Sequence, residues 1–443
     1  MRYLPHTKED IKQMLERAGV SSLNALFDCI PDKLKTKDKM NLPGPLTEWE
    51  LDEHMDVIAS STNASRKSKY FIGGGSYDHF IPASVNYLVS RSEFATAYTP
   101  YQPEVSQGTL QGIYEFQTMI TELTGMDVAT ASHYDGGTAL AEALLIAINK
   151  KKKTRVAVSA LVHPNQREVI KTYFKPQGYE LIEIPYNKDG LTDFEQVENL
   201  GDIAAVAVQS PNFFGNIEDL NLARKVCDGK NAFFISSFTE ALSLGLLKNP
   251  GEAGADIVAG EGQSFGLAKS FGGPGLGLLA GVKKQMRNLP GRFVGKTIDT
   301  KGRDGYVLTL STREQHIRRE KASSNICSNN GLNAMTAAMY LASIGKIGIR
   351  ELAQLNHNKA SFLKKQLEST GFKSPFNSHF FNEFVLIAPD DFESKRAELE
   401  KDKGIYAGIK LARYYPELKN HYLFCATETI KREDIENLAR EVK

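Results

Sequence analysis

Residues 256–281 decide how this chain folds, and they read DIVAGEGQSFGLAKSFGGPGLGLLAG. The stretch begins with an apolar strand, passes through a polar turn and a glycine-rich crossing, and ends in a second apolar strand at residues 276–280. Glycines mark each break, because they permit the positive φ angles that tight turns need. This pattern is typical of a chain segment that builds a binding or catalytic site.

The overall composition limits the classes of partner. At roughly 150 residues per domain, 443 residues predict two or three structural units. The 54 basic and 53 acidic residues nearly cancel, which argues against nucleic acid and anionic membrane surfaces as partners. The four cysteines (Cys29, Cys227, Cys327 and Cys425) are widely spaced. That spacing predicts neither a zinc site nor a disulfide framework and fits a reducing compartment.

The N-terminal residues show no targeting pattern. Glu9, Asp10 and Glu16 interrupt the first twenty residues, unlike a signal or transit peptide. No apolar run reaches the roughly 18 residues that a membrane helix needs. We therefore expect a soluble, cytoplasmic chain without a membrane partner.

Residues 1–65 predict a helical arm. Apolar residues recur at helical spacing in residues 7–18 and again in residues 22–30. Thr47, with Glu50 at the capping-box position, begins a third helix.

Two loops carry unusual chemistry. Residues 71–77 (FIGGGSY) are too glycine-rich for a helix and form either a flexible wall of a binding site or an ordinary connector. In residues 98–108 (YTPYQPEVSQG), two prolines fix an extended path from which tyrosines and amides project. A long amphipathic helix follows at residues 110–123.

Asp135, Gly136, Gly137 and Thr138 open a helix that continues over residues 139–149. Backbone N–H groups at such a start can hold a phosphate. Asp135 would repel a phosphate, however, and it also fits a simple N-cap. Both interpretations remain open from the sequence.

From residue 155 onward, strands and helices alternate, which predicts an α/β domain with a mainly parallel sheet. Ligands in such sheets bind at the carboxyl ends of the strands. Residues 210–215, 236–237 and 262–264 lie at three such ends and should converge on one pocket. We expect a large sheet domain at residues 66–330 and a smaller α+β domain at residues 331–443.

Residues 312–321 (TREQHIRREK) are dense in charge. Such a run forms either a solvated helix face or a segment that binds anions or contacts another subunit, since arginine matches carboxylates bidentately.

With these motifs assembled, the chain resembles the glycine decarboxylase, or P-protein, family of the glycine cleavage system, and in particular its separate N-terminal (alpha) subunit 1. The resemblance is carried by residues 98–108, 135–142, 260–277, 289–295 and 306–327. It implies the aspartate-aminotransferase-like fold of type I pyridoxal phosphate enzymes. That fold has a large domain with a mainly parallel sheet and a smaller C-terminal α+β domain.

The resemblance also implies that this chain's own cofactor site is degenerate. The position of the Schiff-base lysine holds Gln263, and the position of the aspartate that pairs with the ring nitrogen holds Ser236. An amide cannot form an imine and a hydroxyl cannot stabilise a pyridinium charge. With Asp135, Gly136 and Thr138 at the phosphate position, we expect no catalytic residue, cofactor or metal in this chain, and no activity when it is isolated.

The family's complex decarboxylates glycine through pyridoxal phosphate and passes the aminomethyl group to the lipoyl arm of H-protein. The resemblance implies an α2β2 assembly in which the beta subunit, subunit 2, holds the cofactor. This chain would form the interface and complete the beta subunit's site with a wall of polar side chains. The candidates for that wall are Tyr98, Tyr101, Gln102, Glu104, Gln107, His316, Arg318 and Arg319.

Two alternatives stay open. The chain could be a self-sufficient pyridoxal phosphate enzyme that uses Lys269, or a structural pseudoenzyme that touches no substrate pocket.

Overall fold

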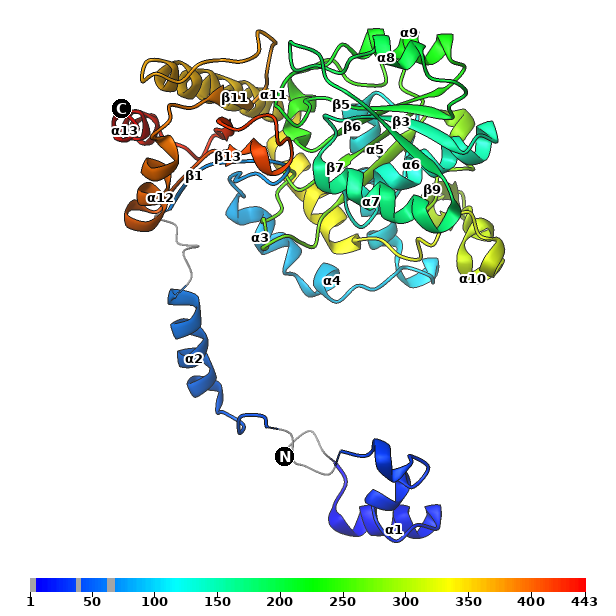
Figure 1. Cartoon of the computed structure of the whole chain (residues 1–443). Coiled ribbons are helices and arrows are strands. Elements are labelled where there is room, and N and C mark those ends of the chain that lie inside the picture. Colours follow the sequence, from blue (N-terminus) through cyan, green and yellow to red (C-terminus); the bar gives the residue numbers. More distant parts are fainter. Residues whose placement is uncertain (1–4, 37–40, 62–67) are drawn as a thin grey trace. The chain divides into compact units, whose positions relative to one another are not determined.

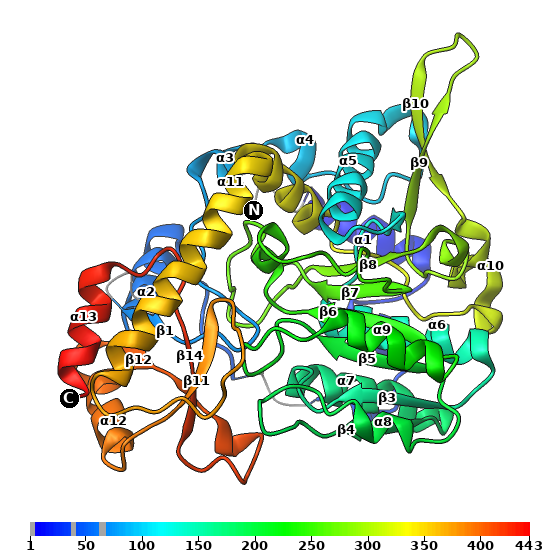
Figure 2. The same ribbon diagram turned by 90° about the horizontal axis from the view of Figure 1, so that it is seen from above.

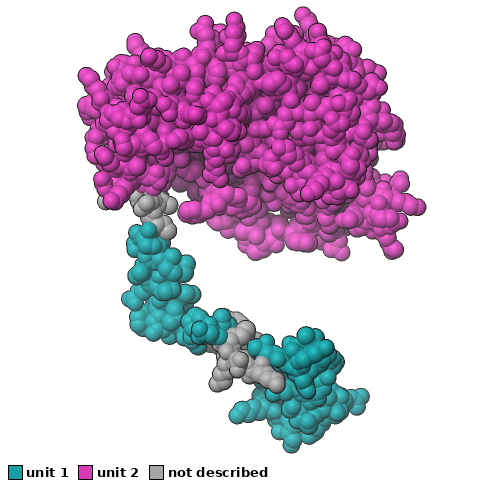
Figure 3. Space-filling model, in the orientation of Figure 1, with its two compact units in different colours: residues 1–63 teal, residues 64–443 magenta. Residues whose placement is uncertain are grey.

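The computed structural model describes residues 5–36, 41–61 and 68–443. The chain divides into two compact units, residues 1–63 and residues 64–443 (Figure 3). The expected border between the arm and the sheet domain, at residues 65 and 66, lies outside the described residues. Among the residues described, no helix is both long and apolar enough to cross a bilayer.

The first unit holds helices α1 (Lys8–Ala18) and α2 (Glu48–Ser60) and the short 3-10 turns η1 (Asn24–Phe27) and η2 (Asp32–Leu34). Helix α2 starts with a capping box between Thr47 and Glu50, which confirms the start predicted there. The helix predicted at residues 22–30 is wrong, because only η1 forms. Leu23 and Phe27 are exposed in that segment, so no packing stabilises a longer helix.

The second unit is built on a seven-stranded sheet with the order β2-β8-β7-β6-β5-β3-β4 (Figures 1 and 2). Its strands are β2 (Val128–Ala129), β3 (Arg155–Ser159), β4 (Glu180–Ile184), β5 (Ala205–Gln209), β6 (Phe233–Phe238), β7 (Ile257–Glu261) and β8 (Gly277–Gly281). Strands β7, β6, β5, β3 and β4 are parallel, whereas β8 is antiparallel to both β7 and β2. The prediction of a mainly parallel α/β sheet is confirmed.

Helices cover both faces of this sheet, so its strands are buried on both sides. Alternate residues of β6 enter different cores: Phe233 and Ile235 pack with α6, whereas Phe234 and Phe238 pack with α5. One layer consists of α6 (Gly136–Lys151) and α7 (Pro164–Phe174), and the other contains α5 (Gln107–Thr124), α9 (Leu220–Gly229) and the start of α11 (Gly331–Glu368).

Shorter elements surround the sheet. They are α3 (Ala83–Val89), α4 (Ser92–Ala95), α8 (Glu195–Glu198), α10 (Gln315–Arg318) and the hairpin of β9 (Phe293–Ile298) with β10 (Asp304–Thr309). Helix α11 is kinked at Gly345, whose φ of 61° breaks the helical geometry between two helical segments.

The C-terminal part forms its own sheet from β11 (Glu383–Ile387), β14 (His421–Cys425) and β13 (Ile409–Lys410). Helices α12 (Phe392–Lys403) and α13 (Arg432–Glu441) share one apolar core with this sheet. Strand β12 (Ile405–Ala407) pairs in parallel with β1 (Lys69–Phe71). Strand β1 precedes the large sheet in the sequence, but it packs against the C-terminal part of the chain.

Candidate functional site: buried carboxylates around Tyr77 and the start of α6

The start of α6 is capped from within the chain. Asp135 accepts a hydrogen bond from the Thr138 backbone N–H at 2.7 Å, and the Thr138 hydroxyl lies 3.2 Å from the Asp135 nitrogen, which completes a capping box. The Gly136 N–H donates to the Glu261 carboxylate at 2.9 Å. Two backbone donors of this helix start, the N–H groups of Gly136 and Thr138, are therefore directed to Glu261 and Asp135.

Glu261 collects backbone donors from three separate segments. Besides Gly136, its carboxylate accepts from the N–H of Gln263 at 3.1 Å and of Leu276 at 2.8 Å. Burial raises the pKa of Glu261 above its ordinary value, and nearby Asp135 adds to that effect, while the three N–H groups act in the opposite direction.

The side chain of Gln263 is hydrogen-bonded to the backbone of Tyr77, in the loop at residues 73–79, and of Leu267. Its amide oxygen accepts from the Tyr77 N–H at 2.9 Å, and its amide nitrogen donates to the Tyr77 carbonyl at 3.2 Å and the Leu267 carbonyl at 2.7 Å. Gln263 is only 7% exposed. The amide thus fixes the backbone of Tyr77.

Ser236 lies in the middle of the sheet, between Val208 of β5 and Val258 of β7. Its side chain is buried, and its hydroxyl has no hydrogen-bond partner within the described part of the chain. Ser236 supplies no negative charge.

Tyr77 joins the strand ends that the sequence placed at one pocket. Its hydroxyl donates to Glu383 at 2.7 Å and lies 3.2 Å from the hydroxyl of Thr239. The Gln209 side chain, at the end of β5, approaches Thr239 at 3.4 Å. Side chains at the ends of β5 and β6 and in the turn after β7 are therefore linked around buried Tyr77, and their convergence on one pocket stays a prediction.

Glu383 also holds the glycine-rich loop. Its carboxylate accepts from the Gly74 N–H at 2.6 Å, and a Cβ atom on Gly73 would lie 2.4 Å from it. Burial raises the pKa of Glu383 to about 7. The loop is clamped at this point by close backbone contact.

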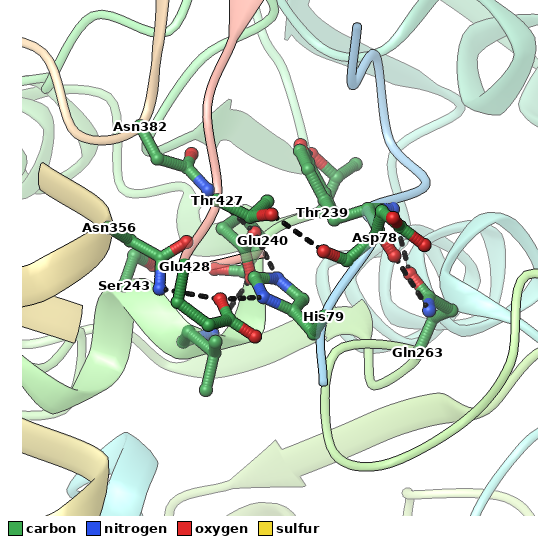
Figure 4. Close-up of polar contacts among 12 residues, drawn as sticks. Asp78, His79, Thr239, Glu240, Ser243, Gln263, Asn356, Asn382, Thr427 and Glu428 are labelled. Carbon is green, nitrogen blue, oxygen red and sulfur yellow. Dashed lines mark hydrogen bonds and ion pairs between the residues drawn. The ribbon is translucent and has the colours of Figure 1, made fainter. Parts of the chain in front are cut away.

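A buried charged cluster lies beside this loop (Figure 4). The His79 ring nitrogens lie 3.0 Å from Glu240 and 2.8 Å from Glu428, and all three side chains are at least nine-tenths buried. Burial lowers the pKa of His79, but the two carboxylates outweigh it and raise the pKa to about 10. His79 is therefore a cation between two glutamates, and it ties the end of β6 to the chain that follows β14.

Lys269 is engaged elsewhere. Its ammonium group lies 3.0 Å from the Asp78 carboxylate and 4.3 Å from the centre of the Tyr70 ring.

The candidate wall residues of the 98–108 segment contact the β9–β10 region. Tyr101 accepts a hydrogen bond from Arg292 at 2.8 Å, and Gln107 bonds to the backbone N–H and carbonyl of Tyr306, both at 2.9 Å. Tyr98 lines a cavity of about 150 Å³. Tyr98, Gln102 and Glu104 are exposed. All five residues are exposed, and the side chains of Tyr101 and Gln107 are in addition held by these hydrogen bonds.

The charged segment forms a separate exposed group. His316 lies 3.5 Å from Glu314, and Arg318 and Arg319 are exposed at the end of α10. Arg319 has a positive φ of 51°.

Pyridoxal phosphate would need an amine, a negative partner for the ring nitrogen and an anion cradle. At the positions expected from the resemblance, this chain has the Gln263 amide and the Ser236 hydroxyl, and the Glu261 carboxylate accepts the neighbouring backbone N–H groups. These residues do not fit the cofactor. Within the described ranges, no group of three His, Cys, Asp or Glu side chains is placed to hold a metal ion.

Sequence reasoning identified Tyr77 only as the last residue of the loop at residues 71–77, and it missed His79, Glu240, Glu261, Glu383 and Glu428. The sequence could have indicated Glu261, because it is an acidic residue at the end of a strand, only two positions before Gln263. The others come from distant parts of the chain, and no local pattern connects them.

Comparison with known proteins gives consistent results along the whole chain. A family model described as "Glycine cleavage system P-protein" matches residues 1–442. A protein of Desulfotalea psychrophila, named probable glycine dehydrogenase (decarboxylating) subunit 1, is 52% identical and covers 100% of this chain and 98% of its own length. A protein of the same name from Geobacillus thermodenitrificans is 47% identical with the same coverage.

Solved structures agree with this result. A crystal structure of glycine decarboxylase (P-protein) of the glycine cleavage system, in inhibitor-bound form, has a TM-score of 0.90 and 42% identity, and it covers 100% of this chain and 99% of its own. A NifS-like protein has a TM-score of 0.61 and 14% identity over 85% of this chain and 98% of its own, which shows a shared fold alone. The chain belongs to the glycine cleavage system P-protein family, whose fold is that of the type I pyridoxal phosphate enzymes.

Proposed function

We propose that this chain is the alpha subunit, subunit 1, of a glycine decarboxylase that works only with a beta subunit. One observation supports the proposal: the amide of Gln263, the residue that the resemblance puts at the position of the Schiff-base lysine, is hydrogen-bonded to Tyr77 and Leu267. A covalently bound cofactor has no attachment point there. The beta subunit would hold pyridoxal phosphate, which takes up the electrons that remain when glycine loses CO2.

The chain's own residues complete the beta subunit's site. Tyr101 is the best-supported wall residue, because Arg292 holds its hydroxyl while 58% of the residue stays exposed. A side chain that is fixed at one end and exposed at a surface can orient a ligand in a neighbouring subunit. Tyr98, Gln102 and Glu104 extend the same surface, and Gln107 anchors it to β10.

His316, Arg318 and Arg319 form the second part of the proposed wall. Their exposure leaves them free to contact an anionic group or the partner subunit.

We place the α2β2 complex in the cytoplasm, where it would pass the aminomethyl group to the lipoyl arm of H-protein. Four free cysteines in the described residues are consistent with a reducing compartment.

Co-expression of this chain with a candidate beta subunit tests the proposal. The two chains should co-purify, and the complex should exchange glycine carboxylate with labelled bicarbonate when H-protein is present. The chain alone should show neither exchange nor an absorbance band of bound pyridoxal phosphate. Turnover by the pure chain, or labelling of Lys269 after borohydride reduction with cofactor, would replace the proposal with a self-sufficient enzyme.

The same complex separates a wall from a purely structural role. Arg319→Ala and Tyr101→Phe variants that assemble normally but turn over more slowly support a wall. Unchanged kinetics in both variants would leave the chain as a structural pseudoenzyme.

A further inference from the structure

The carboxylate of Glu261 lies where a helix start and two turns direct their backbone N–H groups. The donors are Gly136 at the start of α6, Gln263 in the turn after β7, and Leu276 beside the glycine-rich crossing. Three N–H groups from three segments, converging on one anion, form the arrangement that proteins use for phosphate oxygens.

Close packing of the backbone shapes this nest. A Cβ atom on Gly136 would lie 2.9 Å from the Glu261 nitrogen, and one on Gly275 would lie 3.0 Å from the Glu261 carboxylate. The Asn330 side chain donates to the Gly275 carbonyl at 2.7 Å and to the Tyr134 carbonyl at 2.8 Å, which holds the crossing against the segment before α6. Glycines at residues 136 and 275 thus let the three segments meet around the carboxylate.

We propose that Glu261 is a built-in anion that occupies the phosphate cradle of the degenerate cofactor site and closes it to free phosphate and phosphate esters. This inference rests on the proposed function, in which the beta subunit holds the cofactor and the corresponding site of this chain is degenerate. A phosphate could not share these donors with Glu261, because like charges at hydrogen-bond distance from the same N–H groups repel strongly. Asp135, which caps the same helix start, adds to that repulsion.

The proposal predicts that restoring the lysine and the aspartate does not recreate a cofactor site while Glu261 still occupies the phosphate position. A Gln263→Lys, Ser236→Asp variant regains the amine and the ring partner but keeps the filled cradle. It should bind pyridoxal phosphate poorly, and Glu261→Ala added to it should improve binding at least about tenfold, the ratio expected from about 1.4 kcal/mol.

The direct test uses inorganic phosphate as the probe on the full-length chain, or on its complex with the beta subunit if the chain alone does not stay in solution. Thermal unfolding of wild type should not respond to phosphate beyond its response to sodium chloride at matched ionic strength. The midpoint of Glu261→Ala should rise with phosphate by about 2–4 °C as its emptied nest fills. Equilibrium dialysis with labelled phosphate should give one additional site per alpha chain.

Glu218→Ala is the matched control. Glu218 is a buried glutamate that, like Glu261, accepts backbone hydrogen bonds. Its donors are Thr192 and Asn212, and it does not lie at the start of α6. Its removal should create no phosphate site. A folded Glu261→Ala variant without a phosphate site, or a wild-type chain that binds phosphate as well as the variant does, overturns the proposal.

Glu261→Gln provides a second readout should the alanine variant fail to fold. Its single amide oxygen can still accept from Gln263 and Leu276, but its NH2 group would face the Gly136 N–H. Hydrogen exchange in the peptide that contains residues 135–138 should become at least about tenfold faster than in wild type and in Glu218→Gln. Equal exchange in all three proteins would contradict the role of Glu261 at this helix start.

The proposed function and the role of Glu261 can fail independently in these measurements. Covalent cofactor on the wild-type chain contradicts the proposed function, whereas the phosphate and exchange experiments test Glu261 whether or not the beta subunit is active.

Discussion

Arg292 donates a hydrogen bond to the Tyr101 hydroxyl at 2.8 Å, and its guanidinium lies 5.3 Å from the centre of the Tyr101 ring. Arg292 is 95% buried, and its other donors reach Ser328 and Asn329, at 3.2 and 3.1 Å. No carboxylate among the described residues pairs with it, and its hydrogen bonds go to the neutral oxygens of Tyr101, Ser328 and Asn329. A buried guanidinium therefore orients a tyrosine that is exposed on its other side.

Tyr101→Phe should leave assembly with the beta subunit intact and lower turnover about tenfold, the effect of one lost hydrogen bond in the site. Glycine–bicarbonate exchange by the purified complex measures the change. Tyr179→Phe is the control, since Tyr179 packs edge-on against Phe174 at the other side of the sheet domain. Unchanged kinetics would remove Tyr101 from the site.

Arg292→Lys should lower turnover to a similar extent, because a lysine ammonium cannot reproduce the fork that holds Tyr101, Ser328 and Asn329 together. The double variant Arg292→Lys, Tyr101→Phe should be little slower than Arg292→Lys alone if the two residues act as a unit. Multiplicative losses in the double variant would show that they act independently.

His79 should make stability depend on alkaline pH. Its folded-state pKa of about 10 lies above the ordinary 6.5, so its stabilising contribution is complete below pH 6.5 and is lost as pH rises towards 10. Removing the cation by His79→Gln leaves the buried carboxylates of Glu240 and Glu428 without a counter-charge, although their hydrogen bonds from Asn382 and Asn356 remain. The loss should cost about 3–5 kcal/mol of unfolding free energy near pH 6.

Urea unfolding of the complex at pH 6, 8 and 10 measures this dependence. The gap between wild type and His79→Gln should narrow as pH rises. His421→Gln is the control, because burial lowers the pKa of His421 and the sign of its pH dependence is reversed. A constant gap for His79→Gln across the range would contradict a charged His79.

Lys269→Ala should leave the activity of the complex nearly unchanged. The Lys269–Asp78 pair is substantially exposed, with side-chain exposures of 37% and 42%, so its loss costs at most about 1 kcal/mol of stability. Exchange activity and the unfolding midpoint test both parts, and a large loss of activity would revive Lys269 as a catalytic candidate.

The chain alone should self-associate, because apolar side chains that a beta subunit would cover are exposed. Phe271 is 94% exposed and Val105 78% exposed, and such side chains favour association when they are left uncovered. Light scattering after gel filtration should show larger species for the chain alone than for Phe271→Asn. A monodisperse monomer at high concentration would contradict this expectation.

Local sequence determined much of the fold. Alternating apolar strands and helices predicted the mainly parallel sheet, and the spacing of Thr47 and Glu50 predicted the start of α2, because both patterns depend on residues close together in the chain. The segment at residues 22–30 shows the limit of such patterns, since helical spacing without a packing surface yields only η1.

By itself, the sequence determined that Gln263 and Ser236 stand where the resemblance places a lysine and an aspartate. Only the tertiary structure decided what occupies the site instead. Tyr77 and His79 come from a loop more than 150 residues away from Gln263 and Glu240 in the chain, and Glu428 comes from beyond β14. Their positions depend on how the sheet and the C-terminal part close on each other, and no spacing along the chain encodes that closure.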